Sequence, residues 1–325
     1  MENNKPNIDL KDKKILVELD WNARTSNSEI AKKIQLSKKG AEYRIKKLEK
    51  LNIIQGYYPV INFEKIGYTI NRMMFKLQLI DTEIKEKIEE YLKKQENIHW
   101  AVWFRGDADL GIDVWTKSIK EFKEILNQFS IKFGKYIKQK TFSSSVGFDQ
   151  YPYSFLLNKK DERIAIITEE TEIAIIDELD KKILRQLVKN ARESSAEIAR
   201  KINSNYKTVS NRIKQLEKNK ILLCTRALIN VELLGYKMYK LRLCFDNNIQ
   251  QAYKQANEFF KSRLETVYII DFLGEEDYDI EVIVKNEDEF NNLIKDLQNK
   301  IGKLIRGYTY FLFEKNIKVR YLPNI

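Results

Sequence analysis

The chain has 325 residues, which suits two or three domains, and a formal charge of +11, which favours polyanionic partners such as nucleic acid or anionic lipid. Two cysteines exclude a disulfide framework, and a single histidine, His99, excludes His-rich metal sites and most His-based catalysis. Because no apolar run approaches the roughly 18 residues of a membrane span, and residues 1–10 lack a signal-peptide core, a reducing cytoplasm fits best, with no metal or cofactor expected.

An internal repeat is the most informative feature of the sequence. Residues 8–31 return 168 positions later as residues 176–199, and the correspondence continues without a gap. Matching motifs include Asn22-Ala23-Arg24 with Asn190-Ala191-Arg192, and Gly67-Tyr68 with Gly235-Tyr236. A unit of this length is a domain or a domain pair, so the chain is a duplicated module.

Positive charge is concentrated in the first third of each unit. Residues 8–58 hold 12 Lys and Arg against seven Asp and Glu, and residues 176–226 hold 13 against six. The remainder of the chain is therefore close to neutral. Such a distribution is typical of a nucleic-acid footprint, although solvated helix faces would give the same charge pattern.

Three short helices are predicted in each basic third. The first spans about residues 10–20, with Asp9 as its N-cap and apolar residues on one face. The second begins with Ser26-Asn27-Ser28-Glu29, a capping box that the second unit repeats as Ser194-Ser195-Ala196-Glu197, and it should end near Gln35. These signals predict matching helices at matching positions in both units.

The third helix is expected to begin after Ser37 in the first unit and after Asn205 in the second. Its inward stripe comprises Ala41, Ile45 and Leu48, mirrored by Val209, Ile213 and Leu216, and lysines project from the opposite face. A short turn between two helices, the second of them basic, fits the major groove of DNA. Residues 53–58 and 221–226 follow as short strands suited to a wing.

At these residues the chain resembles a known family. The pattern Ile-Asp-x-x-Asp-Lys-Lys-Ile-Leu, then Asn-Ala-Arg, Ser-x-x-Glu-Ile-Ala, Arg-Ile-Lys-x-Leu-Glu and Ile-Ile-x-Gly-Tyr, is similar to that of the Lrp/AsnC, or feast/famine, transcription regulators. The second unit departs from it at Leu223-Cys224-Thr225. Members of this family usually carry one unit and pair as dimers, so the tandem copy is itself a departure.

The resemblance implies winged helix-turn-helix domains whose third helices contact DNA. By position, the candidates for phosphate contact are Ser37, Lys38, Lys39, Lys46, Lys47, Lys207 and Lys214. The candidates for base-edge contact are Glu42, Tyr43, Arg44, Tyr206, Ser210, Asn211 and Arg212. Asn and Arg can bond bidentately to base edges, whereas Lys mainly neutralises phosphate. Arg44 and Arg212 would serve equally well as salt-bridge partners beside the helix, and differences between the two helices suggest an asymmetric operator.

The rest of each unit follows the order strand, helix, two strands, helix, strand. In the first unit the predicted elements are 73–79, 83–94, 100–105, 111–115, 121–133 and 137–148; in the second they are 240–245, 250–261, 267–273, 279–284, 288–300 and 304–313. This order is the split βαβ, ferredoxin-like topology, which agrees with the sensing and oligomerising domain of the family.

The predicted fold is therefore α+β, with two winged helix-turn-helix domains alternating with two ferredoxin-like domains. The expected domains are residues 1–62, 63–149, 176–230 and 231–325, with a connector over 150–175 that contains extra strand structure.

A Gly-x-x-Asp turn is expected between the middle strands of each ferredoxin-like domain. The family associates this turn with an amino-acid effector, and the corresponding residues are Gly106, Asp107, Asp109, Gly274 and Asp277. An ordinary β-turn accounts for the same residue types, because Gly and Asp are favoured there for backbone reasons. Both interpretations remain open.

Trp100, Trp103 and Trp115 lie on adjacent predicted strands and suggest packing between two sheets. Because the units are covalently joined, their sheets could pack face to face within one chain and make an intramolecular pseudo-dimer, with further homo-oligomers open. The expected partners are double-stranded DNA and a small amino-acid effector.

Two other classes of protein remain open. The duplicated architecture also resembles that of sirohaem decarboxylases, but such chemistry would want several His and Arg around a pocket, and only His99 is present, with Val267 at the equivalent position. No catalytic residue is therefore assigned. A sequence-neutral DNA-coating protein is the other alternative, and it would bind all duplexes with similar affinity.

Overall fold

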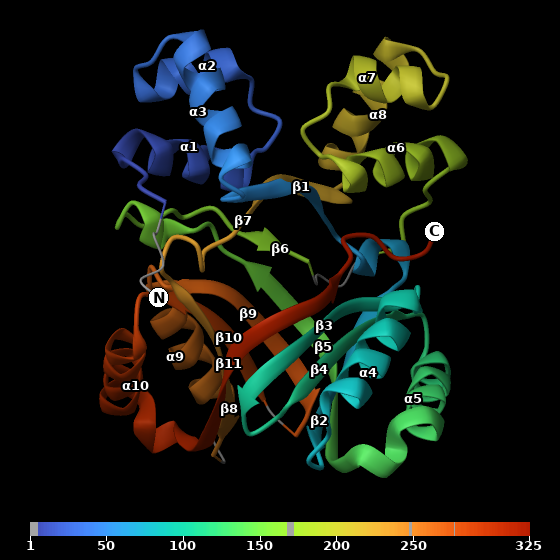
Figure 1. The fold of residues 1–325 in the computed structure, drawn as a ribbon, viewed down its shortest axis with the longest axis vertical. Helices are drawn as coiled ribbons and strands as arrows, with labels where there is room; N and C mark the ends of the chain where they lie inside the picture. Colours follow the sequence, from blue (N-terminus) through green and yellow to red (C-terminus); the bar gives the residue numbers. More distant parts are fainter. Residues whose placement is uncertain (1–5, 168–171, 247–248, 276) are drawn as a thin grey trace.

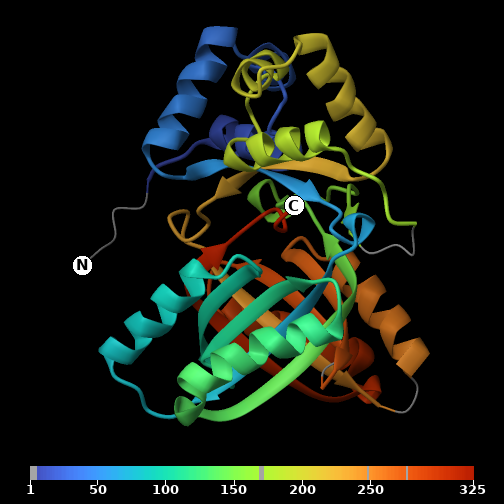
Figure 2. The ribbon, with the colours of Figure 1, turned by 90° about the vertical axis from the view of Figure 1, so that its right-hand side faces the viewer.

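A computed structural model describes residues 6–167, 172–246, 249–275 and 277–325. The chain forms two tiers, with two helical heads at one end and a β-barrel flanked by helices at the other (Figure 1). The same separation is evident after a quarter turn (Figure 2). Each tier takes one set of elements from each unit, so the repeat of the sequence is also a repeat in space.

The heads contain the helices that the sequence predicts. The bounds are α1 Leu10–Trp21, α2 Asn27–Ile34 and α3 Lys38–Lys50 in the first head, and α6 Glu178–Lys189, α7 Ser195–Lys201 and α8 Tyr206–Lys218 in the second. The predicted N-caps are confirmed: Ser26 and Ser194 each form a reciprocal capping box with the Glu three residues later, and Ser37 and Asn205 cap the third helices. Satisfied backbone N–H groups explain why each helix begins where it does.

A small apolar core holds the three helices of each head together. In the first head it includes Ile15, Leu16, Leu19, Ile30, Ala41, Ile45 and Leu48, and in the second Ile183, Leu184, Leu187, Ile198, Val209, Ile213 and Leu216, all of them buried. Full burial of a side chain of this size stabilises the fold by about 1.5–3 kcal/mol. This core fixes which face of the third helix points outward.

The strands after the third helices differ from the expected wings. Strand β1, Ile54–Ile61, and strand β7, Leu222–Ile229, pair with each other in an antiparallel two-stranded sheet. The N–H of Ala23 donates to the Thr225 carbonyl at 2.9 Å, and the N–H of Ala191 donates to the Tyr57 carbonyl at 3.0 Å. Instead of folding back as a hairpin wing, each strand pairs with its counterpart and lies against the first helix of the other unit.

The second tier confirms the predicted ferredoxin-like topology in both units. The first set is β2 Thr69–Leu77, α4 Thr82–Lys94, β3 Ile98–Gly106, β4 Leu110–Thr116, α5 Ile119–Phe133 and β5 Ile137–Gln150. The second set is β8 Lys237–Phe245, α9 Ile249–Lys261, β9 Thr266–Gly274, β10 Tyr278–Val284, α10 Glu287–Ile301 and β11 Ile305–Val319. The strand orders β5-β2-β4-β3 and β11-β8-β10-β9 are those of a split βαβ fold.

The two sheets join edge to edge rather than packing face to face. Strand β3 pairs with β11, and β5 pairs with β9, so that the described strands close into an eight-stranded antiparallel barrel. The three tryptophans do not share one face, because Trp103 donates from Nε1 to Glu89 of the covering helix α4 at 2.9 Å, whereas Trp100 lies inside near Lys240. Alternation along a strand sends residues 100 and 103 to opposite faces.

The connector contains short regular structure, as expected. Strand β6, Ala165–Ile166, adds to the outside of β5, and residues 168–171 lie outside the described ranges. Single turns of 3-10 helix occur at η1 Glu64–Ile66, η2 Gly134–Tyr136, η3 Ser154–Leu156 and η4 Gly302–Leu304. The described part of the connector before residue 168 therefore packs along β5 of the barrel.

Charged side chains fill part of the barrel interior. Arg72 makes two contacts of 2.7 Å with the carboxylate of Asp113 and also contacts Asp279. Lys240 lies 3.1 Å from Asp279 Oδ1 and 2.6 Å from Glu281 Oε1, and all five groups are buried. Burial raises the pKa of Asp113, but the attraction of Arg72 outweighs it, so the pKa is lowered overall. Mutual pairing is what makes these buried charges tolerable.

A second buried ion pair lies where the heads meet the barrel. Arg226 of β7 donates from Nη2 to Asp20 of α1 at 2.6 Å and to the Tyr151 carbonyl at 3.0 Å. The guanidinium also lies over the ring of Tyr153, whose N–H donates to Asp20 at 2.7 Å. One arginine thus connects the first head, the connector and the end of a barrel strand.

Candidate nucleic-acid interface

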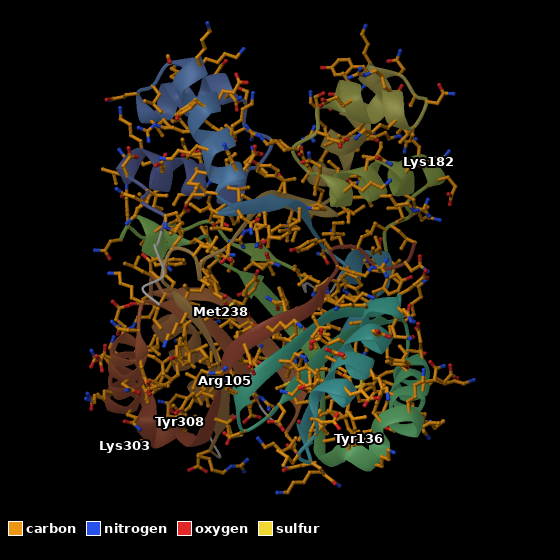
Figure 3. All side chains as sticks on the ribbon, in the orientation of Figure 1. Arg105, Tyr136, Lys182, Met238, Lys303 and Tyr308 are labelled. Carbon is orange, nitrogen blue, oxygen red and sulfur yellow. The ribbon has the colours of Figure 1, made fainter. Side chains whose placement is uncertain are left out.

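The third helices of the two heads lie at the surface on opposite sides of the head tier. In Figure 2, α3 (blue) and α8 (gold) slope away from one another. Many nitrogen-tipped side chains project from the far end of both heads, away from the barrel, whereas labelled residues such as Arg105 and Tyr308 lie in the barrel tier (Figure 3). The outward faces of the two basic helices are therefore accessible, whereas their inward stripes belong to the cores of the heads.

The start of α3 is exposed and positively charged. Lys38 and Lys39 are both exposed, and Ser37 Oγ accepts a hydrogen bond from the Gly40 N–H at 3.0 Å. The N-terminus of a helix presents unpaired N–H groups and a positive dipole end, which together favour phosphate. The structure thus brings three of the predicted phosphate contacts together at one helix end.

Further along α3 the charges alternate. Lys46 is exposed and pairs with half-buried Glu42 at 2.8 Å, one helical turn away, while Lys47 is half-buried. Tyr43 is 70% exposed between them. An exposed pair of this kind contributes little to stability, so Lys46 can exchange its carboxylate for a phosphate at small cost.

The second head presents a different set of groups on α8. Tyr206 is 56% exposed, and Lys207, Asn211 and Lys214 are also exposed, whereas Ser210 is half-buried. An amide takes the place of the phenol of Tyr43 at the equivalent position, and a phenol takes the place of Lys38. The outward surfaces of α3 and α8 therefore differ chemically although their inward stripes match.

Arg44 and Arg212 are engaged within their own heads. Arg44 Nη1 lies 2.8 Å from Asp9 and 2.8 Å from Asp12, at the start of α1. Arg212 repeats the arrangement, with Nη2 2.8 Å from Asp177 and Nη1 3.3 Å from Asp180 at the start of α6. The hydrogen bonds that Arg44 donates to the carboxylates of Asp12 and Asp9 raise the pKa of its guanidinium. Each arginine therefore ties the third helix of its head to the first.

Two functional candidates were not predicted from the sequence, although their motif is visible in both units. Arg24 and Arg192, of the repeated Asn-Ala-Arg turns, are half-buried and donate hydrogen bonds across the boundary between the heads. The repeat was the available signal, because an arginine at the same turn position of both units indicates a shared role. Hydrophobic periodicity could not reveal the contacts of these arginines, since their partners come from the other unit.

The two Gly-x-x-Asp turns lie at the seams of the barrel. A Cβ atom on Gly106 would lie 2.7 Å from the Tyr310 carbonyl oxygen, and one on Gly274 would lie 2.6 Å from the Phe142 carbonyl oxygen. Each glycine thus allows the last strand of the other unit to approach. The requirement for glycine at these turns has a structural cause that is independent of any ligand.

The aspartates that end these turns are also engaged in the fold. Asp109 accepts from the Leu77 N–H at 2.8 Å and pairs with Lys76 at 2.9 Å, and Asp277 accepts from the Phe245 N–H at 2.7 Å. Asp107 is exposed, and residue 276 lies outside the described ranges. Of the carboxylates predicted to receive an effector, Asp107 is therefore the more accessible.

His99 has an ordinary packing environment. Its Nδ1 lies 2.8 Å from the Arg320 carbonyl oxygen, its ring packs on Trp115, and burial lowers its pKa. Among the residues described, no group of three or more His, Cys, Asp or Glu side chains could hold a metal ion. In the same part of the chain no helix is both long and apolar enough to cross a bilayer.

Comparison with known proteins identifies relatives of both units. A model of winged helix-turn-helix DNA-binding domains matches residues 8–55, and a model of AsnC-type helix-turn-helix domains matches residues 176–217. The HTH-type transcriptional regulator LrpA of Pyrococcus horikoshii is 33% identical over 130 residues, covering 39% of this chain and 87% of that protein. The proline dehydrogenase transcriptional activator of Rhodobacter capsulatus is 28% identical over 123 residues, covering 37% of this chain and 79% of that protein.

The whole chain also has a likeness among the solved structures. The siroheme decarboxylase NirDL superposes with a TM-score of 0.62, covering 96% of this chain and 94% of that chain at 11% identity. A likeness at this level of identity concerns the fold alone. The two relatives named above are transcription regulators, and the two family models match the segments that carry the basic helices. The chain therefore belongs to the Lrp/AsnC family of DNA-binding transcription regulators, with two family units in tandem.

Proposed function

We propose that the chain recognises a specific DNA sequence as an intramolecular pseudo-dimer, with α3 and α8 in major grooves of one duplex. The observation that carries this proposal is the reciprocal pairing of the two units, through β1 with β7, β3 with β11 and β5 with β9, beneath two exposed basic helices. In a dimer of single-unit chains the same contacts would join two protomers. Here one chain supplies both halves.

The proposed phosphate contacts are the cations and the helix start already described, all of them exposed except half-buried Lys47. They are Ser37, Lys38, Lys39, Lys46 and Lys47 on the first head, and Lys207 and Lys214 on the second. Each lysine that neutralises a phosphate releases condensed counterions, so the binding constant should fall steeply with salt. These residues supply affinity and register but little sequence preference.

The proposed base contacts come from the outward groups that differ between the heads. Tyr43 with Glu42 on α3, and Tyr206, Ser210 and Asn211 on α8, would face base edges. Asn211 can bond bidentately to adenine, which α3 cannot match at the equivalent Tyr43. Arg44 and Arg212 would contribute by holding these helices at the right angle. The operator is therefore expected to be asymmetric.

Selection of bound sequences from a random duplex pool tests sequence specificity. A regulator should enrich an asymmetric site and prefer it over random DNA by about 4–10 kcal/mol at matched salt. Equal retention of all sequences would instead support a DNA-coating protein. The same experiment defines the duplex needed for every later measurement.

Salt dependence tests the assigned lysines. Replacing Lys39 and Lys46 with Gln removes two phosphate contacts, so the slope of log K against log salt should become less negative by about 1.8. Replacing Lys182, which is exposed on α6, with Gln is the matched control and should leave the slope unchanged. An unchanged slope in the Lys39 and Lys46 variant would remove both residues from the interface.

Light scattering tests the pseudo-dimer. A closed barrel within one chain predicts a compact species of 38.7 kDa that persists on dilution, alone or as the unit of larger assemblies. Assemblies that exchange whole sheets between chains, with no compact single chain at any concentration, would contradict it.

A small amino-acid effector is proposed at the Gly-x-x-Asp turns. Their place at the seams, and exposed Asp107 beside Gly106, support a site where an ammonium group could bias how the two units meet. The measurement is DNA affinity in the presence of each amino acid in turn. Replacing Asp107 with Asn should abolish the response of affinity without changing binding in the absence of effector.

Tetrapyrrole chemistry is the second candidate, because the whole-chain fold likeness is to a siroheme decarboxylase. His99 already contacts Arg320 and Trp115, and charges inside the barrel pair with one another, so these groups are engaged within the fold. The absorption spectrum of the purified protein, alone and after addition of a tetrapyrrole, tests this alternative. A bound, red-shifted absorption band would favour the enzyme.

A further inference from the structure

The arginine of each Asn-Ala-Arg turn bonds to the other head. Arg24 Nη1 donates to the Ala191 carbonyl at 3.0 Å and to the Glu193 carbonyl at 2.5 Å, and its Nη2 donates to Ser195 Oγ at 3.3 Å. Each acceptor belongs to the turn before α7 or to the first residue of that helix. The first head is thereby tied to the start of a helix in the second.

The reverse contact has the same form. Arg192 donates to the carbonyls of Ala23 and of Thr25, the latter at 3.1 Å, and to Asn27 Oδ1 at 2.6 Å. Asn27 is the first residue of α2, as Ser195 is the first of α7. The two arginines thus form a reciprocal pair related by the repeat of the chain.

The guanidinium groups of Arg24 and Arg192 favour directional hydrogen bonds over non-directional charge attraction. A guanidinium is planar and carries its donors in a rigid fork, so three acceptors at set positions hold it in one orientation. Both arginines are half-buried, and this burial lowers the pKa of each. Most of the acceptors are backbone carbonyls, which cannot rotate away as side chains do.

The route from this pair to DNA is short. Helices α2 and α7 pack on α3 and α8 through Ile30, Ala31 and their counterparts Ile198 and Ala199. The position of each second helix therefore sets the position of the third helix in the same head. Because each arginine fixes the second helix of the opposite head, the pair governs how far apart the two third helices lie.

We propose that Arg24 and Arg192 are positioning residues that fix the separation of α3 and α8, so that the chain accepts two half-sites at only one spacing. This inference rests on the proposed function. Neither arginine needs to touch DNA, since each already donates three hydrogen bonds to the opposite head. B-DNA turns once in about 10–10.5 bp, so a 5 bp insertion places one half-site on the wrong face.

The test uses three duplexes built from the selected operator: the selected spacing, the same half-sites separated by 5 bp more, and one half-site alone. The wild-type chain should bind the lengthened duplex at least about 100-fold more weakly than the selected one, because only one head can engage. The R24A/R192A variant should bind the two within about tenfold, while its affinity for the single half-site stays within about twofold of wild type.

Two further variants serve as controls. The first separates the planar geometry of the guanidinium groups from their charge, and the second shows the effect of removing a different arginine from a head. R24K/R192K keeps both charges but lacks the planar fork, and it should lose spacing discrimination as the alanine variant does. R200A removes an exposed arginine from α7 and should keep the full wild-type discrimination. Unchanged half-site affinity shows that the heads of each variant are folded.

The outcomes separate the two proposals. An R24A/R192A variant with the wild-type spacing penalty overturns the proposal that the arginines fix the spacing, as does full recovery of the penalty in R24K/R192K. Loss of half-site binding in the alanine variant but not in the lysine variant also overturns it, because the arginine charges would then act on phosphate. If the wild-type chain enriches half-sites but tolerates every spacing, only the proposal that Arg24 and Arg192 fix the spacing fails. If it enriches no sequence from the random pool, the proposed function itself fails.

Discussion

The junction between head and barrel differs sharply between the two units, although their helices match closely. In the second unit Arg226 of β7 forms a buried pair with Asp20. At the positions related by 168 residues stand Tyr58, whose ring stacks on Tyr321 at 4.1 Å, and Val188. In a symmetric dimer each residue occurs in both copies of an interface. The two units of a duplicated chain are free of that constraint. Here one junction has the ion pair of Arg226 with Asp20, and the equivalent junction has Tyr58 and Val188.

The barrel interior shows the same divergence in a milder form. Arg72 corresponds to Lys240 and Asp113 to Glu281, so the signs of charge are retained. Asp279 has no counterpart, because the equivalent residue is Gly111, where a Cβ atom would lie 2.7 Å from Phe104. One half has room for an extra carboxylate and the other does not. Asp279 therefore serves the cations of both units.

The largest expected loss of stability follows from removing Arg72, which contacts Asp113 of the first unit and Asp279 of the second. Replacing Arg72 with Met leaves Asp113 without its partner in a buried site, and the free energy of unfolding should fall by about 3–5 kcal/mol. Chemical denaturation monitored by tryptophan fluorescence measures it, since three of the four tryptophans lie in the barrel. The control is Arg105→Met, which breaks an exposed pair with Glu314 and should cost less than about 1 kcal/mol.

The difference between wild type and Arg72→Met should shrink in acid. With Arg72 present, the lowered pKa of Asp113 gives stability that is complete above its ordinary pKa of 3.8 and is lost as pH falls through the lowered value. Without Arg72, burial alone raises the pKa of Asp113, so the variant gains relative stability as pH falls. A constant difference between pH 7 and pH 4 would contradict the assigned pairing.

Exchanging the junction residues of one unit for those of the other gives the sharpest comparison. Arg226→Tyr alone leaves Asp20 buried and uncompensated, and it should cost several kcal/mol. Adding Asp20→Val installs the pair found at Tyr58 and Val188 and should recover most of that loss. The double-mutant cycle measures the coupling, and additive single losses would show that the two residues act independently.

A smaller difference is expected between the arginines that tie the third helix to the first. Arg44 is 25% exposed and contacts both of its carboxylates at 2.8 Å, whereas Arg212 is 34% exposed with one contact of 3.3 Å. Arg44→Ala should destabilise its head by about 1 kcal/mol and Arg212→Ala by about half as much. Hydrogen exchange of each third helix measures the two effects separately, and the reverse order would refute the comparison.

Much of the head fold was predictable because its determinants are local. The capping boxes at Ser26 and Ser194 and the stripe containing Ile45 and Ile213 depend on spacings of three and four residues, which the sequence displays directly. The ferredoxin-like order was predictable for the same reason, since each strand and helix alternates in its own pattern. Because the chain is duplicated, each capping box and each apolar stripe occurs twice, and both occurrences support the same prediction.

Contacts between the units were not predictable, because the contacting residues lie about 170 positions apart and produce no periodic pattern in the sequence. The exchanged strands β1 and β7 have the composition expected of wing strands, and only their pairing partner differs. Arg24 and Arg192 carried a visible motif whose acceptors are mostly backbone carbonyls, which have no sequence signature. The engagement of Arg44 with Asp9 and Asp12 was one of two open interpretations, and choosing between them required the position of α1 relative to α3.

Closure of the barrel through β11 has a consequence for synthesis of the protein. The partner of β3 emerges from the ribosome about 200 residues after β3 itself, which at about 5–20 residues per second leaves that edge unpaired for roughly 10–40 s. Strand β5 waits likewise for β9. Unpaired edges are templates for association with other chains. Translation speed and temperature should therefore set how much of the nascent protein matures rather than aggregates.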